Sequence, residues 1–202
     1  MHYVNYIWDF DGTLADSYPH TASAFCDIMA KDGVTVDRDE AEQLLRTLLF
    51  LAYERYGLTQ EQVDRFLAYE KTEQSQPPIR LYPCALDVLR TLYGRGARHF
   101  LATHRDEAAK AYLEKLGAAP YFTDVVTRQS GFPYKPDPAC VLYLIKKHGL
   151  DPRHTLMVGD RELDVACGRR AGIDGCLLVE ADPPADTCAA FCIRDLRELL
   201  DL

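Results

Sequence analysis

Apolar and polar positions follow two different rhythms along this chain. The first eight residues contain a short, nearly continuous apolar run that ends at Trp8, as expected of a parallel strand covered on both faces. From about residue 80 onward, short apolar runs alternate with stretches of helical periodicity. This strand–helix alternation predicts an α/β core, a doubly wound, Rossmann-like parallel sheet with right-handed crossovers.

The segments of this core can be placed from the pattern. Strands are expected over 97–103, 121–126, 155–158 and 175–179. Helices are expected over 106–116, 136–148 and 162–171. Gly117 and Gly149 directly follow the first two of these helices, where glycine commonly ends a helix, and both are expected to act as stops.

Between Asp16 and Arg80 the pattern is helical, with no convincing strand. Helices are expected over 17–31, 37–56 and 59–73, the second of which can break in its middle. Asp37 is placed to cap the second helix, and Thr59 with Gln62 three residues later resembles a capping box for the third.

Two prolines, Pro77 and Pro78, then break the helical register. We therefore expect an α/β core formed by residues 1–15 and 80–202, and a small all-helical domain of residues 16–79 inserted after the first strand. A helical insertion at this position fits a cap that closes over a site at the edge of the sheet.

Composition narrows the classes of function. The chain has 202 residues, 48% of them hydrophobic, enough for one substantial core and a small second lobe. Its net charge of −8 argues against nucleic acid or an anionic membrane as the main partner, because both favour basic patches. No uncharged stretch approaches the roughly 18 residues of a membrane span, and no signal segment precedes the first strand. A cytoplasmic protein is therefore expected.

The cysteines indicate neither a disulfide framework nor a zinc site. Their number, seven, is odd, and their spacing includes no Cys-x-x-Cys pair and no Cys/His cluster of the zinc type. We expect them to be reduced and to serve as small core residues.

Two aspartates stand where the first strand meets a glycine. Asp9 and Asp11 are two positions apart in the string Ile-Trp-Asp-Phe-Asp-Gly-Thr-Leu of residues 7–14. On an extended chain such residues point the same way, so both carboxylates can face one pocket before Gly12 turns the backbone. Two anions held so close repel unless a cation or a shared proton offsets them. A plain Asp–Gly turn after a strand is the alternative interpretation.

Further polar residues follow other predicted strands. Thr103 ends one strand, and Asp160 follows another. Ligands bind outside the carboxyl ends of the strands in such a sheet, so these residues are expected at one edge. Asp160 and Asp164 are four positions apart at the start of a helix, an arrangement that suits Mg²⁺ but that helix capping also favours. Lys135 lies apart from any strand, in a proline-flanked loop before a helix.

These segments, in this order, resemble the motifs of the haloacid dehalogenase (HAD) superfamily of phosphohydrolases. The resemblance covers nearly the whole chain; it is strong over 9–14 and 134–173 and weak in the helical insertion. It is closest to the phosphoglycolate phosphatase-like and β-phosphoglucomutase-like group, which has a small helical cap. In that family, a cap inserted at this position supplies substrate specificity.

The resemblance implies roles for the four aspartates. Asp9 would be the nucleophile that forms an aspartyl-phosphate, and Asp11 would protonate the leaving alcohol and later take a proton from water. Mg²⁺ would be held by the Asp9 carboxylate, the Asp11 backbone carbonyl and Asp160. Asp164 would bind the ion directly, or it would contact the residues that bind the ion without binding it itself.

The resemblance also implies a phosphate site. Thr103 and Lys135 would hold the phosphate, because a hydroxyl and nearby amides can bind a phosphoryl oxygen while the ammonium neutralises charge. His104 is assigned as a further phosphate-binding residue. His104, Arg105 and Arg161 extend toward the crevice, where they could contact the leaving group; a solvated position on its rim is the alternative.

Other polar residues are left without an assigned role. His20, near the entry to the helical insertion, is expected on the surface at a helix start. Arg46, Tyr53 and Arg55 are conceivable substrate contacts in the insertion, and none is assigned.

The predicted function is that of a magnesium-dependent phosphatase acting on a small phosphorylated metabolite. A phosphosugar mutase of the β-phosphoglucomutase type shares the motifs, but such enzymes carry a histidine slightly later than His20, where this chain has Thr21. Dehalogenation needs neither magnesium nor a second acid, so it would leave Asp11, Lys135 and the acidic pair of Asp160 and Asp164 unexplained in part. A non-catalytic module that binds phosphorylated metabolites is the alternative outside enzymes. The sequence indicates neither the physiological substrate nor the oligomeric state.

Overall fold

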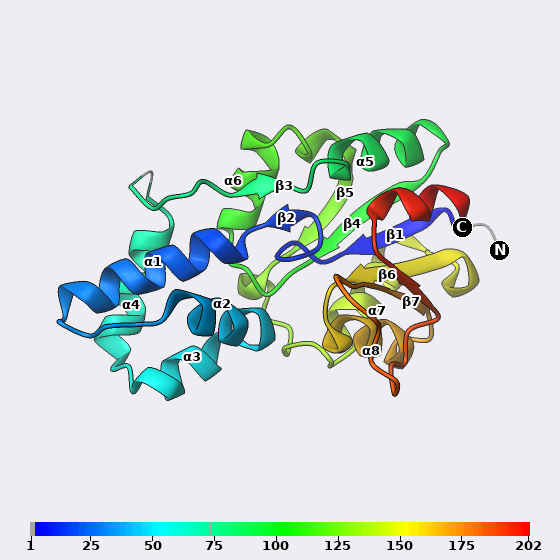
Figure 1. The fold of residues 1–202 in the computed structure, drawn as a ribbon. Coiled ribbons are helices and arrows are strands. Elements are labelled where there is room, and N and C mark those ends of the chain that lie inside the picture. The colour runs from blue at the N-terminus through cyan, green and yellow to red at the C-terminus, as the bar shows by residue number, and fades with distance from the viewer. Residues whose placement is uncertain (1–2, 73) are drawn as a thin grey trace. The chain divides into compact units, whose positions relative to one another are not determined.

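A computed structural model describes residues 3–72 and 74–202 (Figure 1). The chain divides into two compact units. One unit consists of Met1–Ala15 and Leu81–Leu202, and the other of Asp16–Arg80. The chain passes between them at two very short strands, β2 (Ala15–Asp16) and β3 (Arg80–Leu81), which pair in a two-stranded sheet.

The larger unit is built on a six-stranded sheet in the order β5-β4-β1-β6-β7-β8, with every described pairing parallel. Its strands are β1 (Asn5–Trp8), β4 (Arg98–Ala102), β5 (Phe122–Val126), β6 (Thr155–Gly159), β7 (Asp174–Leu178) and β8 (Phe191–Ile193). In the register, Trp8 of β1 lies opposite Leu101 on one side and Val158 on the other. The predicted Rossmann-like parallel sheet is confirmed, with β8 as an additional strand.

Helices cover this sheet on both faces (Figure 1). They are α5 (Ala85–Gly94), α6 (Ala108–Lys115), α7 (Ala139–His148) and α8 (Glu162–Arg170), with short 3-10 turns η1 (Ala119–Tyr121), η2 (Arg128–Ser130), η3 (Pro152–His154) and η4 (Leu196–Asp201). On one face, Phe100 and Met157 of the sheet pack in a single buried cluster with Leu144 of α7 and Cys167 of α8.

Helix α7 begins later than the sequence pattern predicts. Its first residue is Ala139, not Pro136, and the Asp137 carboxylate accepts a hydrogen bond from the Ala139 N–H at 2.9 Å. Asp137 precedes Pro138, and a residue before a proline is disfavoured in the helical conformation. The two prolines therefore delay the helix by three residues and leave an extended loop next to Lys135.

Helix α8 lies very close to the sheet because two glycines permit it. A Cβ added at Gly168 of α8 would lie 2.7 Å from Met157 Cβ, and one added at Gly175 of β7 would lie 2.8 Å from Val165 Cβ. Ordinary contacts of this kind are at least 3.4 Å. The close packing of α8 on β6 and β7 thus requires residues without a side chain at positions 168 and 175.

The smaller unit is all-helical. Its helices are α1 (Tyr18–Lys31), α2 (Arg38–Thr47), α3 (Leu49–Tyr56) and α4 (Gln60–Glu70). The predicted break falls at Leu48, whose extended backbone separates α2 from α3. The predicted caps are present, since Asp37 accepts from the Glu40 N–H and Thr59 forms a capping box with Gln62. The last helix ends at Glu70, and residue 73, its predicted end, lies outside the described residues.

His20 is buried, so its predicted surface position is wrong. Only 3% of His20 is exposed. Its Nδ1 lies 2.7 Å from the Pro77 carbonyl oxygen and its Nε2 lies 2.8 Å from the Glu70 carbonyl oxygen. The imidazole thus connects α1 with the end of α4 and with the returning chain, a role that no local pattern in the sequence reveals.

All seven cysteines are free, and three of them, Cys140, Cys167 and Cys176, are buried. The expectation that all serve as core residues is therefore wrong for the other four. Among the described residues, none of the helices combines the length and the apolar character needed to cross a membrane.

Candidate active site

Three neighbouring strands bring the candidate residues to one edge of the sheet. Asp9 directly follows β1, Thr103 follows β4, and Asp160 follows β6. The Asp9 N–H donates to the Val158 carbonyl at 2.9 Å, so the strand pairing continues as far as the aspartate. Because β1 lies between β4 and β6, the carboxyl ends of all three strands meet there.

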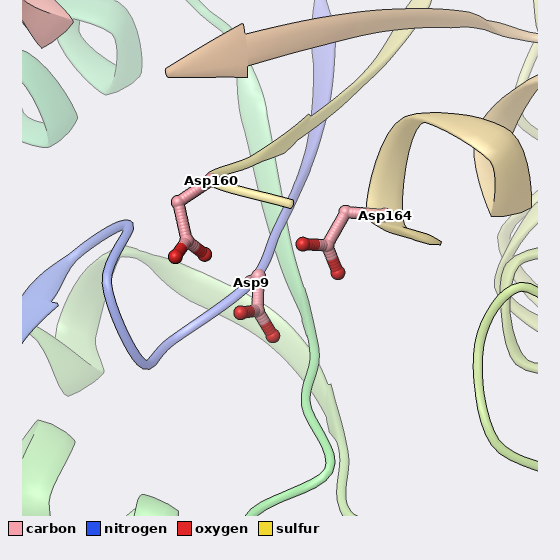
Figure 2. A group of neighbouring side chains, drawn as sticks. All are labelled: Asp9, Asp160 and Asp164. Carbon is pink, nitrogen blue, oxygen red and sulfur yellow. The ribbon is translucent and has the colours of Figure 1, made fainter. Parts of the chain in front are cut away.

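Three carboxylates gather at this edge. One oxygen from each of Asp9, Asp160 and Asp164 lies within 4.8 Å of the others, and Figure 2 shows the side chains converging from β1, β6 and α8. Asp9 and Asp164 are buried, and Asp160 is half-buried. The Thr13 hydroxyl donates to Asp160 Oδ1 at 3.2 Å.

Gly159 allows Asp164 to approach so closely. A Cβ added at this glycine would lie 2.3 Å from Asp164 Cβ and 2.5 Å from its Cγ. Asp164 also accepts a hydrogen bond from the Arg161 N–H at 3.2 Å, as part of a capping box at the start of α8. Asp164 therefore caps the helix and also belongs to the acidic group, whereas Asp160 precedes the helix.

Lys135 supplies a buried positive charge to this group. Its Nζ lies 2.7 Å from Asp9 Oδ1 and 2.5 Å from Asp164 Oδ1, and it donates to the Ala102 carbonyl at 3.0 Å. Burial disfavours the ammonium, but the charges of Asp164 and Asp9 outweigh it and hold the pKa of Lys135 above its ordinary value. Lys135 is therefore a charged counter-ion of both carboxylates.

The other oxygen of Asp9, Oδ2, is buried, and no group of the described residues makes a hydrogen bond to it. The Arg161 guanidinium is close to this oxygen, with its Nη2 3.7 Å away. Burial raises the pKa of Asp9 above its ordinary value against the opposing charge of Lys135, and the Asp164 charge adds to the increase. A buried carboxylate oxygen without a partner is costly unless a ligand satisfies it.

This arrangement fits a hard divalent cation. Magnesium ions take oxygen ligands and commonly bind between one or two carboxylates and a phosphate. Three carboxylates face two cationic side chains here. Among the described residues, the buried Asp9 Oδ2 has no hydrogen-bond partner, and Asp164 Oδ1 has only its ion contact with Lys135. The residues therefore offer both the charge and the donor atoms that such an ion needs.

The Asp11 carboxylate lies outside this group of three and is held by Arg105. The guanidinium makes contacts of 2.7 and 2.9 Å to Asp11 Oδ1 and 3.1 Å to Oδ2. The Arg105 side chain is only 9% exposed and lies against the rings of Phe10 and Tyr112. The alternative of a solvated rim position is therefore wrong for Arg105.

Thr103 and His104 face different partners. Thr103 is buried, and its Oγ1 accepts from the Arg105 N–H at 3.0 Å. His104 is half-buried, and its Nε2 accepts from the Lys135 N–H at 2.7 Å. These contacts connect the segment after β4 with the loop before α7. The phosphate contact of His104 stays a prediction.

The comparison with known proteins establishes the family. A family model described as Haloacid dehalogenase-like hydrolase matches residues 6–178. The chain belongs to this family. The resemblance read from the sequence is thereby confirmed, as is the prediction that the protein is an enzyme.

This hydrolase is similar to several named phosphatases. The phosphoglycolate phosphatase of Rhodospirillum rubrum is 33% identical to it over 183 residues, which cover 83% of this chain and 76% of the relative. Phosphoglycolate phosphatase 1 of Pseudomonas aeruginosa is 29% identical over 210 residues, covering 96% and 77%. The crystal structure of a predicted phosphoglycolate phosphatase from Haemophilus somnus shares the fold, with a TM-score of 0.87, 22% identity and coverage of 100% and 98%.

The candidate contacts in the helical unit of the hydrolase are engaged within that unit. Arg46 pairs with Glu42 at 2.9 Å, and Arg55 pairs with Glu40 at 2.8 Å. The Tyr53 ring packs on the ring of Phe66. These contacts assign no substrate role to the three residues.

Some residues around the site were not singled out from the sequence. Thr13 and Gly159 lie beside the recognised aspartates, so their positions in the motifs were an available signal. Tyr112, which packs against Arg105, lies on α6 in a segment without a motif. Only the fold brings that ring to the site.

Proposed function

We propose that this hydrolase is a magnesium-dependent phosphatase that cleaves a small phosphate monoester through an aspartyl-phosphate formed on Asp9. The observation that carries the proposal is the buried Asp9 Oδ2, which lacks a hydrogen-bond donor among the described residues, on a carboxylate that gathers with those of Asp160 and Asp164. The names of the similar phosphatases support a small phosphorylated metabolite, such as phosphoglycolate, as the substrate.

Magnesium would be held by the carboxylates of Asp9 and Asp160 and by the Asp11 backbone carbonyl, with Asp164 as a further ligand or as support. When bound, the ion would polarise the phosphoryl group and neutralise its charge. Lys135 would add a second positive charge next to the reacting oxygen of Asp9, because its Nζ already lies 2.7 Å from the other oxygen. Thr103 would bind a phosphoryl oxygen.

The reaction would proceed in two displacements. In the first, an Asp9 oxygen bonds to phosphorus while the bond from phosphorus to the ester oxygen breaks, and Asp11 gives that oxygen a proton. In the second, Asp11 takes a proton from water, which attacks phosphorus and releases inorganic phosphate and the Asp9 carboxylate. Splitting one hard displacement into two easier ones is the advantage of the covalent route.

We further propose that the helical unit of Asp16–Arg80, which the sequence places at residues 16–79, is a cap that contacts the leaving group. Its four helices carry their own buried cluster around Phe25 and Phe66, so it can move as one body. A unit of this kind, connected to the core by only two chain crossings, is suited to admit substrate and to exclude water.

The test is a phosphate-release screen over phosphoglycolate, sugar phosphates, nucleotides and an aryl phosphate, with magnesium and with chelator. We expect turnover that requires magnesium and that Asp9→Asn lowers at least about 10³-fold, because the amide is no nucleophile. Asp87→Asn is the matched control, since the Asp87 carboxylate is exposed on α5 and pairs with Arg90 on the same helix.

Unchanged phosphate release by Asp9→Asn would refute the nucleophile assignment. Conversion of one sugar phosphate isomer into another without release would instead indicate a mutase, in which a sugar hydroxyl and not water accepts the phosphoryl group.

A further inference from the structure

We propose that His104 is a positioning residue, whose ring nitrogen fixes the Lys135 backbone and thereby places Nζ between Asp9 and Asp164. The effect on turnover rests on the proposed function, whereas the hydrogen bond itself can be tested without it. This role differs from a contact between His104 and phosphate.

The key contact links two distant loops of the core unit. The Lys135 N–H donates to His104 Nε2 over 2.7 Å, across 31 positions of sequence. A ring nitrogen that accepts a hydrogen bond carries a lone pair, so the proton of the neutral imidazole must be on Nδ1. The backbone contact therefore selects one tautomer of His104.

The surroundings keep the imidazole neutral and oriented. Burial, with a smaller contribution from the neighbouring charge of Lys135, lowers the pKa of His104 to about 3. The Tyr134 ring packs edge-on against His104, with 4.6 Å between the ring centres. The acceptor on Nε2 is thus available throughout the neutral pH range.

Lys135 depends on such a contact because no regular element holds its backbone. It lies between β5 and α7, in the loop that the prolines keep out of the helix. Its Nζ must nevertheless reach Asp9, Asp164 and the Ala102 carbonyl together. An error of about 1 Å in the position of a catalytic group can lower the rate by about 100-fold.

The first test compares three substitutions of His104. In His104→Gln the side-chain oxygen can reach the position of Nε2, whereas the shorter His104→Asn places its oxygen near Nδ1, and His104→Leu has no acceptor. We expect His104→Leu and His104→Asn to lose about 10- to 100-fold in kcat/KM. His104→Gln should retain most of the activity, and His154→Leu, which changes an exposed histidine, should retain all of it.

A double-mutant cycle with Lys135→Met then separates the two roles. If His104 acts through Lys135, adding His104→Leu to Lys135→Met causes no further loss. If His104 contacts phosphate by itself, the two losses multiply, and that outcome would overturn the proposal.

A further test measures the hydrogen bond itself, in the wild-type protein and without turnover. Its result depends neither on the folding of the variants nor on the phosphatase proposal. In the uniformly ¹⁵N-labelled wild-type protein, we expect a scalar coupling across the hydrogen bond between the Lys135 amide nitrogen and His104 Nε2. The ring nitrogen shifts should identify Nδ1 as the protonated one. A missing coupling, or a proton on Nε2, would contradict the inference even in an enzyme that hydrolyses phosphate esters.

Discussion

At the residue scale, each charged group of the site is paired with a group from a distant part of the chain. Lys135 is 126 positions from Asp9, Arg105 is 94 positions from Asp11, and Thr13 is 147 positions from Asp160. Breaking a buried ion pair by removing one partner typically costs about 3–5 kcal/mol, because the other charge stays buried. Substitutions at the site therefore change both stability and chemistry, and controls must separate the two.

The variant Asp11→Asn allows an effect on the chemistry to be separated from an effect on stability. The variant cannot donate a proton to the leaving oxygen, so we expect a large loss of kcat with alkyl phosphates, whose alcohols leave poorly. The loss should be milder with aryl phosphates, whose leaving groups need less protonation. Rates measured over a series of leaving groups test this, and equal losses across the series would count against an acid role for Asp11.

His99 gives a second prediction, on stability. It is fully buried in β4, its Nδ1 accepts from Trp8 Nε1 at 3.0 Å, and burial lowers its pKa to about 4 from 6.5. The unfolded chain therefore binds a proton near pH 6.5 and the folded chain only near pH 4. Stability from this group is complete above pH 6.5 and falls by up to about 3 kcal/mol as the pH falls toward 4.

Urea unfolding between pH 7 and pH 5 measures this effect. His99→Asn keeps an acceptor near Nδ1 for Trp8 but cannot be protonated in this range. Its stability should fall less steeply over the interval than that of the wild type. Identical slopes would show that His99 does not contribute.

The identities of the acidic residues could be predicted from sequence, but their partners could not. Asp9, Asp160 and Asp164 occur in short recognisable strings, and the structure brings them together; their roles remain predictions. Nothing local indicates that Arg105 would bind Asp11 or that His104 would meet Lys135, because these contacts depend on how separate loops are placed by the sheet. The burial of His20 has the same cause, since its partners Pro77 and Glu70 lie 57 and 50 positions away along the chain.

At the scale of elements, the strands were predicted more accurately than the helix starts. Strands β4, β5, β6 and β7 fall within one residue of their predicted positions at each end. The central strand β6 is buried along its whole length, and its nearly continuous apolar run is typical of a buried parallel strand. Helix α7 was predicted to begin too early, since periodicity does not register the effect of successive prolines. The three-residue strand β8 is too short to give a pattern of its own.

The close approach of α8 to the sheet gives a prediction at this scale. Gly168→Ala would place a Cβ 2.7 Å from Met157 Cβ, so α8 must shift outward, and we expect a loss of about 1–3 kcal/mol. The shift should also displace Asp164 and weaken the response to magnesium. Thermal unfolding and magnesium titration measure the two effects.

Gly94→Ala in α5 is the matched control. A Cβ added there meets no atom within 4 Å, so the free energy of unfolding should change by less than about 1 kcal/mol, with the magnesium response unaltered. Equal effects of the two substitutions would argue against close packing of α8 as the cause.

At the scale of the whole molecule, we expect magnesium to stabilise the folded state. The chain carries a net charge of −8, and only the folded state assembles the three carboxylates of the site. A ligand present at 100 times its dissociation constant stabilises by about 2.7 kcal/mol if it binds the folded state alone. The melting temperature should therefore rise in magnesium chloride relative to sodium chloride of the same ionic strength.

Asp160→Asn should abolish this rise. Asp182→Asn should preserve it, because the Asp182 side chain is 94% exposed and its carboxylate pairs with Arg194, outside the acidic group. A similar rise in both variants would indicate general screening of the acidic chain by the divalent salt.

The ammonium of Lys135 has a practical consequence for handling the protein. Because its Nζ lies between Asp9 and Asp164, the polypeptide balances much of the buried negative charge from its own sequence. After a chelator has removed the metal, the protein should therefore be inactive but still folded, with an unchanged far-ultraviolet circular dichroism spectrum. Adding magnesium back to this sample should restore its phosphatase activity within the time of mixing, with no refolding step.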